Sequence, residues 1–95
     1  MTYRILYNPK VLSEDLSLLN RDLHDRIIHA IERRLTTEPL QYGEPLRHRF
    51  KGCWKLRVGD YRIVYMFFQH VVLIVAIRHR KNVYALLPHR ILWRP

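Results

Sequence analysis

The chain has 95 residues, of which 48% are hydrophobic, and it carries a formal net charge of +9. This length predicts a single domain over residues 1–95, with a tail of uncertain order from about residue 88. The hydrophobic content excludes a disordered chain, the single cysteine excludes an intrachain disulfide, and the longest apolar run, residues 71–77, is too short to span a membrane. Without a signal-peptide pattern at its start, the protein is expected to be cytoplasmic.

The N-terminal residues predict a strand followed directly by a helix. In residues 3–7, Tyr3, Ile5 and Tyr7 alternate with Arg4 and Leu6, as in a short strand. Asn8 then has the residue type of a helix N-cap, and Pro9 suits the first helical position.

The next segment has the apolar spacing of amphipathic helices. Leucines recur every three or four residues from Leu12 to Leu23, and a second stripe continues every four residues to Leu35. Asn20 is placed to cap the second helix, and a proline after the stripe ends it. We expect two helices, arranged as a helical hairpin, within residues 9–37.

The second half of the chain changes to the period of strands. Residues 39–45 are expected to form a loop, and strand-like alternation is expected from Leu46 onward. Three antiparallel strands follow in a meander, at residues 53–58, 61–68 and 71–77. The prediction is an α+β fold of two layers: an N-terminal strand, two helices, the three-strand meander and a short C-terminal segment.

Residues 59–60, Gly-Asp, have the composition of a two-residue hairpin loop, and this fixes a register. Arg57 would lie directly opposite Arg62, and alternation would place Lys55 on the same face. Like charges opposite one another destabilise a sheet, so three cations without an acid predict an anion site; the alternative is a solvated basic face. The other face, toward the helices, would take Trp54, Leu56, Val58, Tyr61, Ile63 and Tyr65.

Positive charge is concentrated in the second half. Residues 1–44 hold six Lys and Arg against seven Asp and Glu, whereas residues 45–95 hold eleven Lys and Arg against Asp60 alone. This asymmetry indicates a polyanionic partner. RNA, DNA, an acidic membrane surface and an acidic protein all fit the composition, which does not distinguish among them.

A second basic cluster, residues 78–81 (Arg-His-Arg-Lys), follows the last predicted strand. His79 carries the proton that moves most easily near neutral pH, and Tyr84 offers a ring on which a base can stack. The alternatives are a solvated loop and a core aromatic. No glycine-rich phosphate loop or pair of histidines at metal-ligand spacing is present, so neither a metal nor a cofactor is expected.

Two segments resemble the RelE/ParE family of toxins from type II toxin–antitoxin systems. They are residues 56–65, Leu-Arg-Val-Gly-Asp-Tyr-Arg-Ile-Val-Tyr, and residues 79–84, His-Arg-Lys-Asn-Val-Tyr. The order of predicted elements also agrees, over residues 3 to about 87. RelE-like members cleave messenger RNA on the ribosome, whereas ParE-like members poison DNA gyrase. Retention of the basic positions favours the RelE-like activity.

The resemblance implies a site, although Arg57 departs from the family's lysine-rich pattern and His79 is unusual. It also implies two partners, the ribosome with its messenger RNA and an acidic antitoxin. The implied catalytic residues are Lys55, Arg57, Arg62, Arg78, His79 and Tyr84. The residues expected to bind RNA are Arg47, Arg49, Lys51, Arg80 and Lys81.

RNA can be cut without a metal, by attack of a 2′-hydroxyl on the adjacent phosphate. Lys55 is the candidate base, because Arg57 and Arg62 nearby disfavour its charged form. The two arginines would hold the phosphate oxygens as negative charge builds on them. His79 is the candidate general acid, supported by a neighbouring arginine, Arg78 or Arg80.

Overall fold

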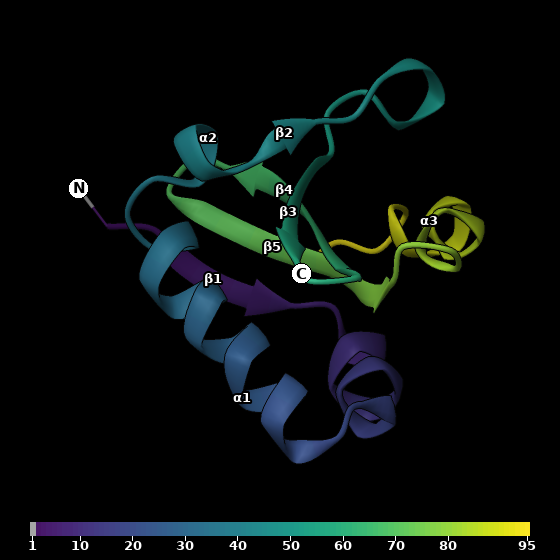
Figure 1. Cartoon of the computed structure of the whole chain (residues 1–95). Coiled ribbons are helices and arrows are strands. Elements are labelled where there is room, and N and C mark those ends of the chain that lie inside the picture. The colour runs from purple at the N-terminus through teal and green to yellow at the C-terminus, as the bar shows by residue number, and fades with distance from the viewer. Residues whose placement is uncertain (1) are drawn as a thin grey trace.

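A computed structural model describes residues 2–95, which form one five-stranded sheet with helices on both of its faces (Figure 1). The strands are β1 (Arg4–Tyr7), β2 (Glu44–Pro45), β3 (Trp54–Val58), β4 (Tyr61–Phe68) and β5 (Val71–His79). The helices are α1 (Arg21–Ala30), α2 (Pro39–Tyr42) and α3 (Val83–Arg90), with further helical turns at Val11–Asp15, Leu16–Leu18, Ile31–Leu35 and His48–Phe50.

The two predicted helical segments are confirmed, together with the residues that begin them. The side-chain oxygen of Asn8 accepts a hydrogen bond from the Lys10 N–H (2.8 Å), and that of Asn20 accepts one from the Leu23 N–H (2.9 Å). Leu19 between the segments is extended, with φ −92° and ψ 141°. Each cap satisfies a backbone donor that would otherwise have no partner in the first turn.

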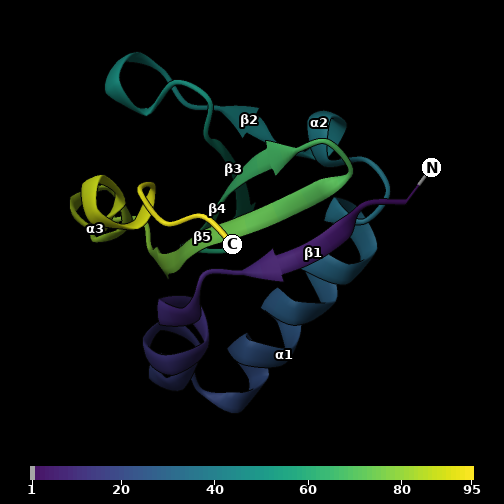
Figure 2. The same cartoon turned by 180° about the vertical axis from the view of Figure 1, so that it is seen from behind.

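The predicted hairpin and its register are also confirmed. β3 and β4 pair antiparallel with Arg57 opposite Arg62, and the loop residue Gly59 has φ +58°, which glycine adopts without strain. β4 pairs antiparallel with β5, and β1 pairs parallel with the other edge of β5, giving the strand order β1-β5-β4-β3-β2. Figure 2 shows β1 lying along β5 on the side of the sheet away from β3.

The main core lies between α1 and the sheet. Ile27, Ile31 and Leu35 recur every four residues and are fully buried, so this stripe anchors the helix. The sheet face that we predicted to meet the helices is confirmed. It contributes Leu56, Val58, Ile63 and Tyr65 to the core, with Trp54 and Tyr61 packed at its margin.

Residues 39–52 differ from the prediction. The expected loop contains α2 and the short strand β2, which pairs with Trp54 and Lys55. The expected alternation after Leu46 is wrong, because residues 47–52 form a projecting loop that contains a 3₁₀ turn (Figure 1). His48 and Gly52 have positive φ, and such residues interrupt a strand.

The predicted short C-terminal segment contains the helix α3, which takes in residues 88–90 of the predicted tail, whereas residues 91–95 lie beyond the end of the helix. Pro88 lies inside this helix and obscured it in the sequence, since proline removes one helical hydrogen bond. α3 buries Val83 and Leu87 against the sheet face opposite α1, so the domain has a partial third layer. We call this the α3 face; the second core on it also contains Cys53, Val64, Leu73, Val75 and Ala76.

β5 extends two residues beyond its predicted end, so Arg78 and His79 belong to the strand. A bulge also interrupts β5, because Val64 pairs with Ala76 whereas Tyr65 pairs with Ile74. Val75 and Ala76 consequently both face the second core, and the alternation of side chains beyond them is inverted. No helix within residues 2–95 is long and apolar enough to cross a membrane.

Candidate functional site

A row of arginines crosses three strands on the α3 face. Arg57 of β3 lies opposite Arg62 of β4, which in turn lies opposite Arg78 of β5. Lys55 is opposite Val64, a member of the second core, and so shares this face. We call Lys55, Arg57 and Arg62 the basic patch.

The first turn of α3 brings Tyr84 to the basic patch. Lys55 Nζ donates to Tyr84 Oη at 3.5 Å, although 29 residues separate them in the chain. Both side chains are half-buried, so the contact is partly shielded from water. α3, which sequence reasoning did not find, is therefore what positions Tyr84.

The projecting loop also reaches this site, through Phe50. Its ring stacks on Tyr84 with 6.4 Å between centroids and 30° between planes, and the Arg49 guanidinium lies 4.8 Å from the Phe50 centroid. Arg47 and Lys51 lie on the same loop and are exposed. Sequence reasoning missed Phe50, because the ring meets Tyr84 only when the loop and α3 are folded together.

Arg57 has an acidic neighbour that the sequence did not reveal. Glu44 in β2 lies opposite Lys55, and its Oε1 is 3.2 Å from Arg57 Nε. The predicted patch without an acid is thus corrected. More than half of each side chain is exposed, so the ion pair contributes about 0–1 kcal/mol and leaves Arg57 able to exchange it for another anion.

Arg62 and Arg80 both lie at the hairpin loop. Arg62 Nη1 donates to the carbonyl oxygens of Gly59 (3.1 Å) and Tyr61 (3.0 Å). The backbone N–H of Arg80 donates to the backbone carbonyl of Asp60 (2.8 Å). The side-chain Nε of Arg80 lies 3.8 Å from the Asp60 carboxylate. Neither guanidinium has a buried partner, so both can contact a bound anion.

Arg78 is committed to the fold rather than to the basic patch. Its Nε donates to Oδ1 of the fully buried Asp15 at 2.7 Å. Arg90 of α3 binds the same carboxylate through two nitrogens, at 2.9 and 3.0 Å, and the Ile77 N–H donates to it at 2.9 Å. Burial alone would raise the pKa of Asp15, but these donors outweigh it and lower the pKa below its usual value. Arg78 therefore has a structural partner that the sequence did not reveal, and its expected catalytic role stays a prediction.

His79 lies on the wrong face for the role that we expected. It is opposite Tyr61, with the rings in edge contact at 5.7 Å, and Tyr61 packs against the main core. The His79 Nδ1 accepts the Lys81 N–H at 3.1 Å. The bulge in β5 inverts the alternation that would otherwise have placed His79 on the same face of the sheet as Lys55, so the structure does not bring the two together.

Cys53 is buried, and burial raises the pKa of its thiol, so it is an ordinary core cysteine. Among residues 2–95, no three His, Cys, Asp or Glu side chains are grouped so that they could hold a metal ion. The candidate residues that have no fully buried ionic partner in the described structure are therefore Lys55, Arg57, Arg62, Arg80 and Tyr84.

Comparison with known proteins matches the chain to a toxin family. Residues 5–84 match the model described as the ParE toxin of the type II toxin–antitoxin system parDE. The curated protein Toxin RelG of Mycobacterium tuberculosis is 36% identical over 73 residues, which cover 67% of this chain and 84% of the relative.

Solved structures of similar fold include two RelE proteins. The toxin–antitoxin complex RelBE2 of Mycobacterium tuberculosis gives a TM-score of 0.78 at 27% identity, covering 84% of this chain and 100% of that one. A mutant of the Escherichia coli toxin RelE in the free state gives a TM-score of 0.74 at 19% identity, covering 96% and 99%. The second likeness shows the fold alone.

Proposed function

This chain belongs to the RelE/ParE superfamily of type II toxin–antitoxin toxins, and we propose that it is an endoribonuclease that cuts messenger RNA on the ribosome. The observation that carries the proposal is the meeting of Lys55 and Tyr84 beside Arg57 and Arg62 on one face of the sheet. This arrangement combines a candidate base, two phosphate-binding cations and an aromatic ring, which internal attack by a 2′-hydroxyl requires.

In this mechanism Lys55 accepts the proton of the 2′-hydroxyl that attacks the adjacent phosphate. The Arg57 and Arg62 guanidiniums lie on the same face of the sheet as Lys55. Their N–H groups also hold the phosphate oxygens, whose charge increases in the transition state. Arg57 would give up its exposed ion pair with Glu44 to do so.

Tyr84 and Phe50 would hold the nucleobase next to the phosphodiester bond that is cut. Their rings already stack on each other at the margin of the basic patch, and an unstacked base of single-stranded RNA adds readily to such a surface. The hydrogen bond from Lys55 to Tyr84 Oη links the position of Lys55, the candidate general base, to the position of the Tyr84 ring.

The leaving 5′ oxygen needs a donor other than His79, which lies on the opposite face. We assign this contact to Arg80, which is exposed at the hairpin loop beside Arg62. Arginine does not release its proton near neutral pH, so Arg80 donates a hydrogen bond and solvent completes the protonation. Arg47, Arg49, Lys51 and Lys81 supply further phosphate contacts.

An acidic antitoxin is the proposed partner in the resting state. The RelBE2 structure is itself a toxin–antitoxin complex. With eleven Lys and Arg against Asp60 alone in residues 45–95, this chain offers an acidic protein a complementary surface. A protein that acts on the ribosome would work in the cytoplasm, which is the compartment that we propose for it.

The test is to map RNA 5′ ends in a translating extract with wild-type protein, with Lys55→Ala and with Lys10→Ala. Lys10 is a matched control, since it is an exposed lysine that pairs only with Glu14. Wild type and the control should create new 5′ ends within coding sequences, and Lys55→Ala should create none. Inhibition of DNA gyrase by all three proteins, without new 5′ ends, would instead assign the ParE-like activity.

A further inference from the structure

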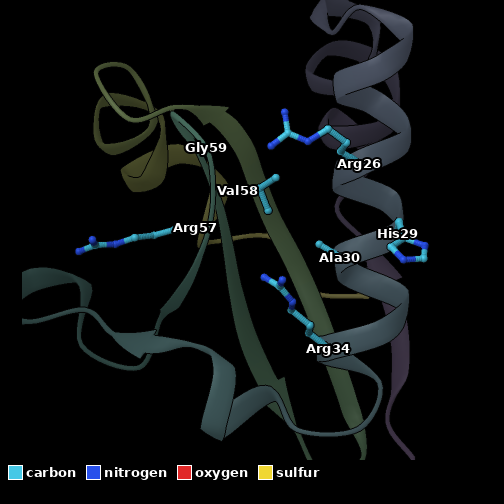
Figure 3. Close-up of a pocket in the computed structure, with 7 residues that line it drawn as sticks. All are labelled: Arg26, His29, Ala30, Arg34, Arg57, Val58 and Gly59. Atoms are coloured by element: carbon cyan, nitrogen blue, oxygen red, sulfur yellow. The ribbon is translucent and has the colours of Figure 1, made fainter.

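A second basic region lies behind the edge of the sheet, between α1 and β3. It is a cleft of about 320 Å³. Figure 3 shows Arg26 and Arg34 reaching from the helix toward β3, whereas Arg57 points away from the helix toward the α3 face. We call it the α1–β3 cleft; its lining consists of Arg26, His29, Ala30, Arg34, Arg57, Val58 and Gly59.

The helix presents this cleft because of its sequence spacing. Arg26, Ala30 and Arg34 recur every four residues, in the row next to the buried stripe of Ile27 and Ile31. Because the buried stripe packs on the sheet, the neighbouring row of Arg26, Ala30 and Arg34 must face the hairpin end of β3. Since position 30 is an alanine, the space between the two arginines stays open.

The two arginines carry charge without a counter-ion. Within residues 2–95, no carboxylate lies within ion-pair distance of Arg26 or Arg34, although Asp22 and Asp25 are on the same helix. The Arg34 guanidinium lies 5.7 Å from the ring centroid of Tyr42, a contact that leaves its outer N–H groups available. Two cations that converge on a hollow without an acid predict an anionic occupant.

The cleft and the basic patch meet at the hairpin loop. Arg62 Nη1 donates to the Gly59 carbonyl from the α3 face, and Arg26 Nη2 lies 3.7 Å from where a Cβ on Gly59 would be. β2 covers β3 only at Trp54 and Lys55, so it leaves the Arg57–Gly59 part of this edge open. The positive charge of the basic patch thus continues around the edge of β3 into the cleft, and Gly59, which has no side chain, leaves this path open.

The composition of the cleft favours a sugar–phosphate backbone over a protein segment. Protein interfaces depend on apolar or aromatic anchors that enter fully desolvated pockets, and here the apolar lining is only Ala30 and Val58. Nucleic-acid backbones are instead held mainly by arginine, lysine and other donors to phosphate oxygens.

We infer that the RNA strand held at the basic patch crosses the β3 edge at Gly59 and places its next phosphates in the α1–β3 cleft, on Arg26 and Arg34. This inference rests on the proposed RNA cleavage and extends its binding site to the other side of the sheet. The cleft increases the affinity for RNA and sets the path of the RNA strand, and it takes no part in the bond-breaking step.

The experiment measures binding of two fluorescent 2′-O-methyl oligoribonucleotides, which cannot be cut, to the full chain by anisotropy. One of about 4 nucleotides covers the basic patch, and one of about 12 nucleotides also reaches the cleft. Arg26→Gln/Arg34→Gln removes the cleft cations. Arg4→Gln/Arg21→Gln removes two exposed arginines outside the cleft and is the matched control.

Each phosphate contact on a single strand contributes about 0.7 to the salt slope of log affinity, so the cleft variant should lose about 1.4 from the slope for the long oligonucleotide. Between roughly 50 and 200 mM salt, wild-type affinity should therefore fall about sevenfold more than that of the variant. The control should keep the wild-type slope, and Arg26→Lys/Arg34→Lys, which preserves the charge and the fold, should keep it as well.

Three failures are distinguishable. If wild-type protein cuts RNA on ribosomes but binds both oligonucleotides with the same slope, the cleft inference is overturned and the proposed function stands. If it binds neither oligonucleotide and cuts no RNA, the proposed function itself fails. Binding of a polyglutamate peptide that requires Arg26 and Arg34, with RNA binding unaffected by their loss, would assign the cleft to an acidic protein and also overturn the inference.

Discussion

Asp15 is the residue whose loss should unfold the site most directly. Its carboxylate is fully buried and joins the turn Val11–Asp15, the strand β5 and the helix α3, through Ile77, Arg78 and Arg90. Since α3 carries Tyr84, the network also holds the helix that completes the site. Asp15→Asn removes the charge while keeping the size of the side chain.

The structure indicates a large effect. Arg90 is 6% exposed and would lose its close buried counter-ion, keeping only the half-exposed Glu14 carboxylate at 3.7 Å, and breaking such a buried pair costs about 3–5 kcal/mol. Domains of this size are stable by about 5–14 kcal/mol, so the variant should lose about a fifth of its stability or more. At about 4 °C or more per kcal/mol, the melting temperature should fall by at least about 12 °C.

The assay is urea denaturation followed by circular dichroism at several pH values, with Glu14→Gln as control. Glu14 touches the same arginines only at 3.7 Å and is 46% exposed, so its loss should cost less than about 1 kcal/mol. Because the pKa of Asp15 is lowered in the folded state, its stabilisation is complete above the unfolded value of about 3.9 and is lost as pH falls through the folded pKa. The difference between wild type and Asp15→Asn should be constant near neutral pH and shrink below about pH 4. A variant that unfolds within about 1 kcal/mol of wild type at pH 7 would refute the reasoning.

Three further predictions follow from other parts of the molecule. Gly43→Ala should destabilise the fold by about 1–3 kcal/mol or more in urea denaturation, because a Cβ there would lie 1.7 Å from the hydroxyl oxygen of the fully buried Tyr65; wild-type stability would show that the backbone moves freely at this position. Arg62→Ala should abolish cutting yet cost no more than about 1–3 kcal/mol, since it gives up two hydrogen bonds, an exposed one to the Gly59 carbonyl and a half-buried one to the Tyr61 carbonyl; a much larger loss in thermal melting would make Arg62 structural. Association with an acidic antitoxin should slow steeply as salt increases in stopped-flow measurements, because residues 45–95 attract it electrostatically; a rate that does not respond to salt would argue against this mode of recognition.

The basic patch could be predicted from the sequence because a two-residue loop fixes the register of the two strands that it joins. Once residues 59–60 form the turn, Arg57 must lie opposite Arg62, and Lys55 must share their face. The stripe ending at Leu35 identified the packed face of the helices for the same reason, since helical spacing is local.

The errors lie where local pattern gives way to tertiary contact. His79 was assigned to the site, but a single bulged residue in β5 reverses its face, and no feature of the strand's composition marks the bulge. The sequence gives no sign that Arg78 is paired, because its partner Asp15 is 63 residues away in the chain. Phe50 and Glu44 meet the site through a loop and a two-residue strand, which have no periodicity to detect.

The dependence of cutting on the ribosome tests the central claim most directly. The proposed site has a lysine as its candidate base, and its other cations are arginines, which do not release protons near neutral pH. The proposed catalysis would therefore depend on a substrate that is already positioned. Positioning can supply about 7–11 kcal/mol of a barrier, and a ribosome that grips messenger RNA can provide it. Purified protein should leave naked messenger RNA intact and cut the same RNA on programmed ribosomes. Equal cutting of both would contradict the account, and inhibition of DNA gyrase without cutting of either would assign the chain to the ParE-like activity.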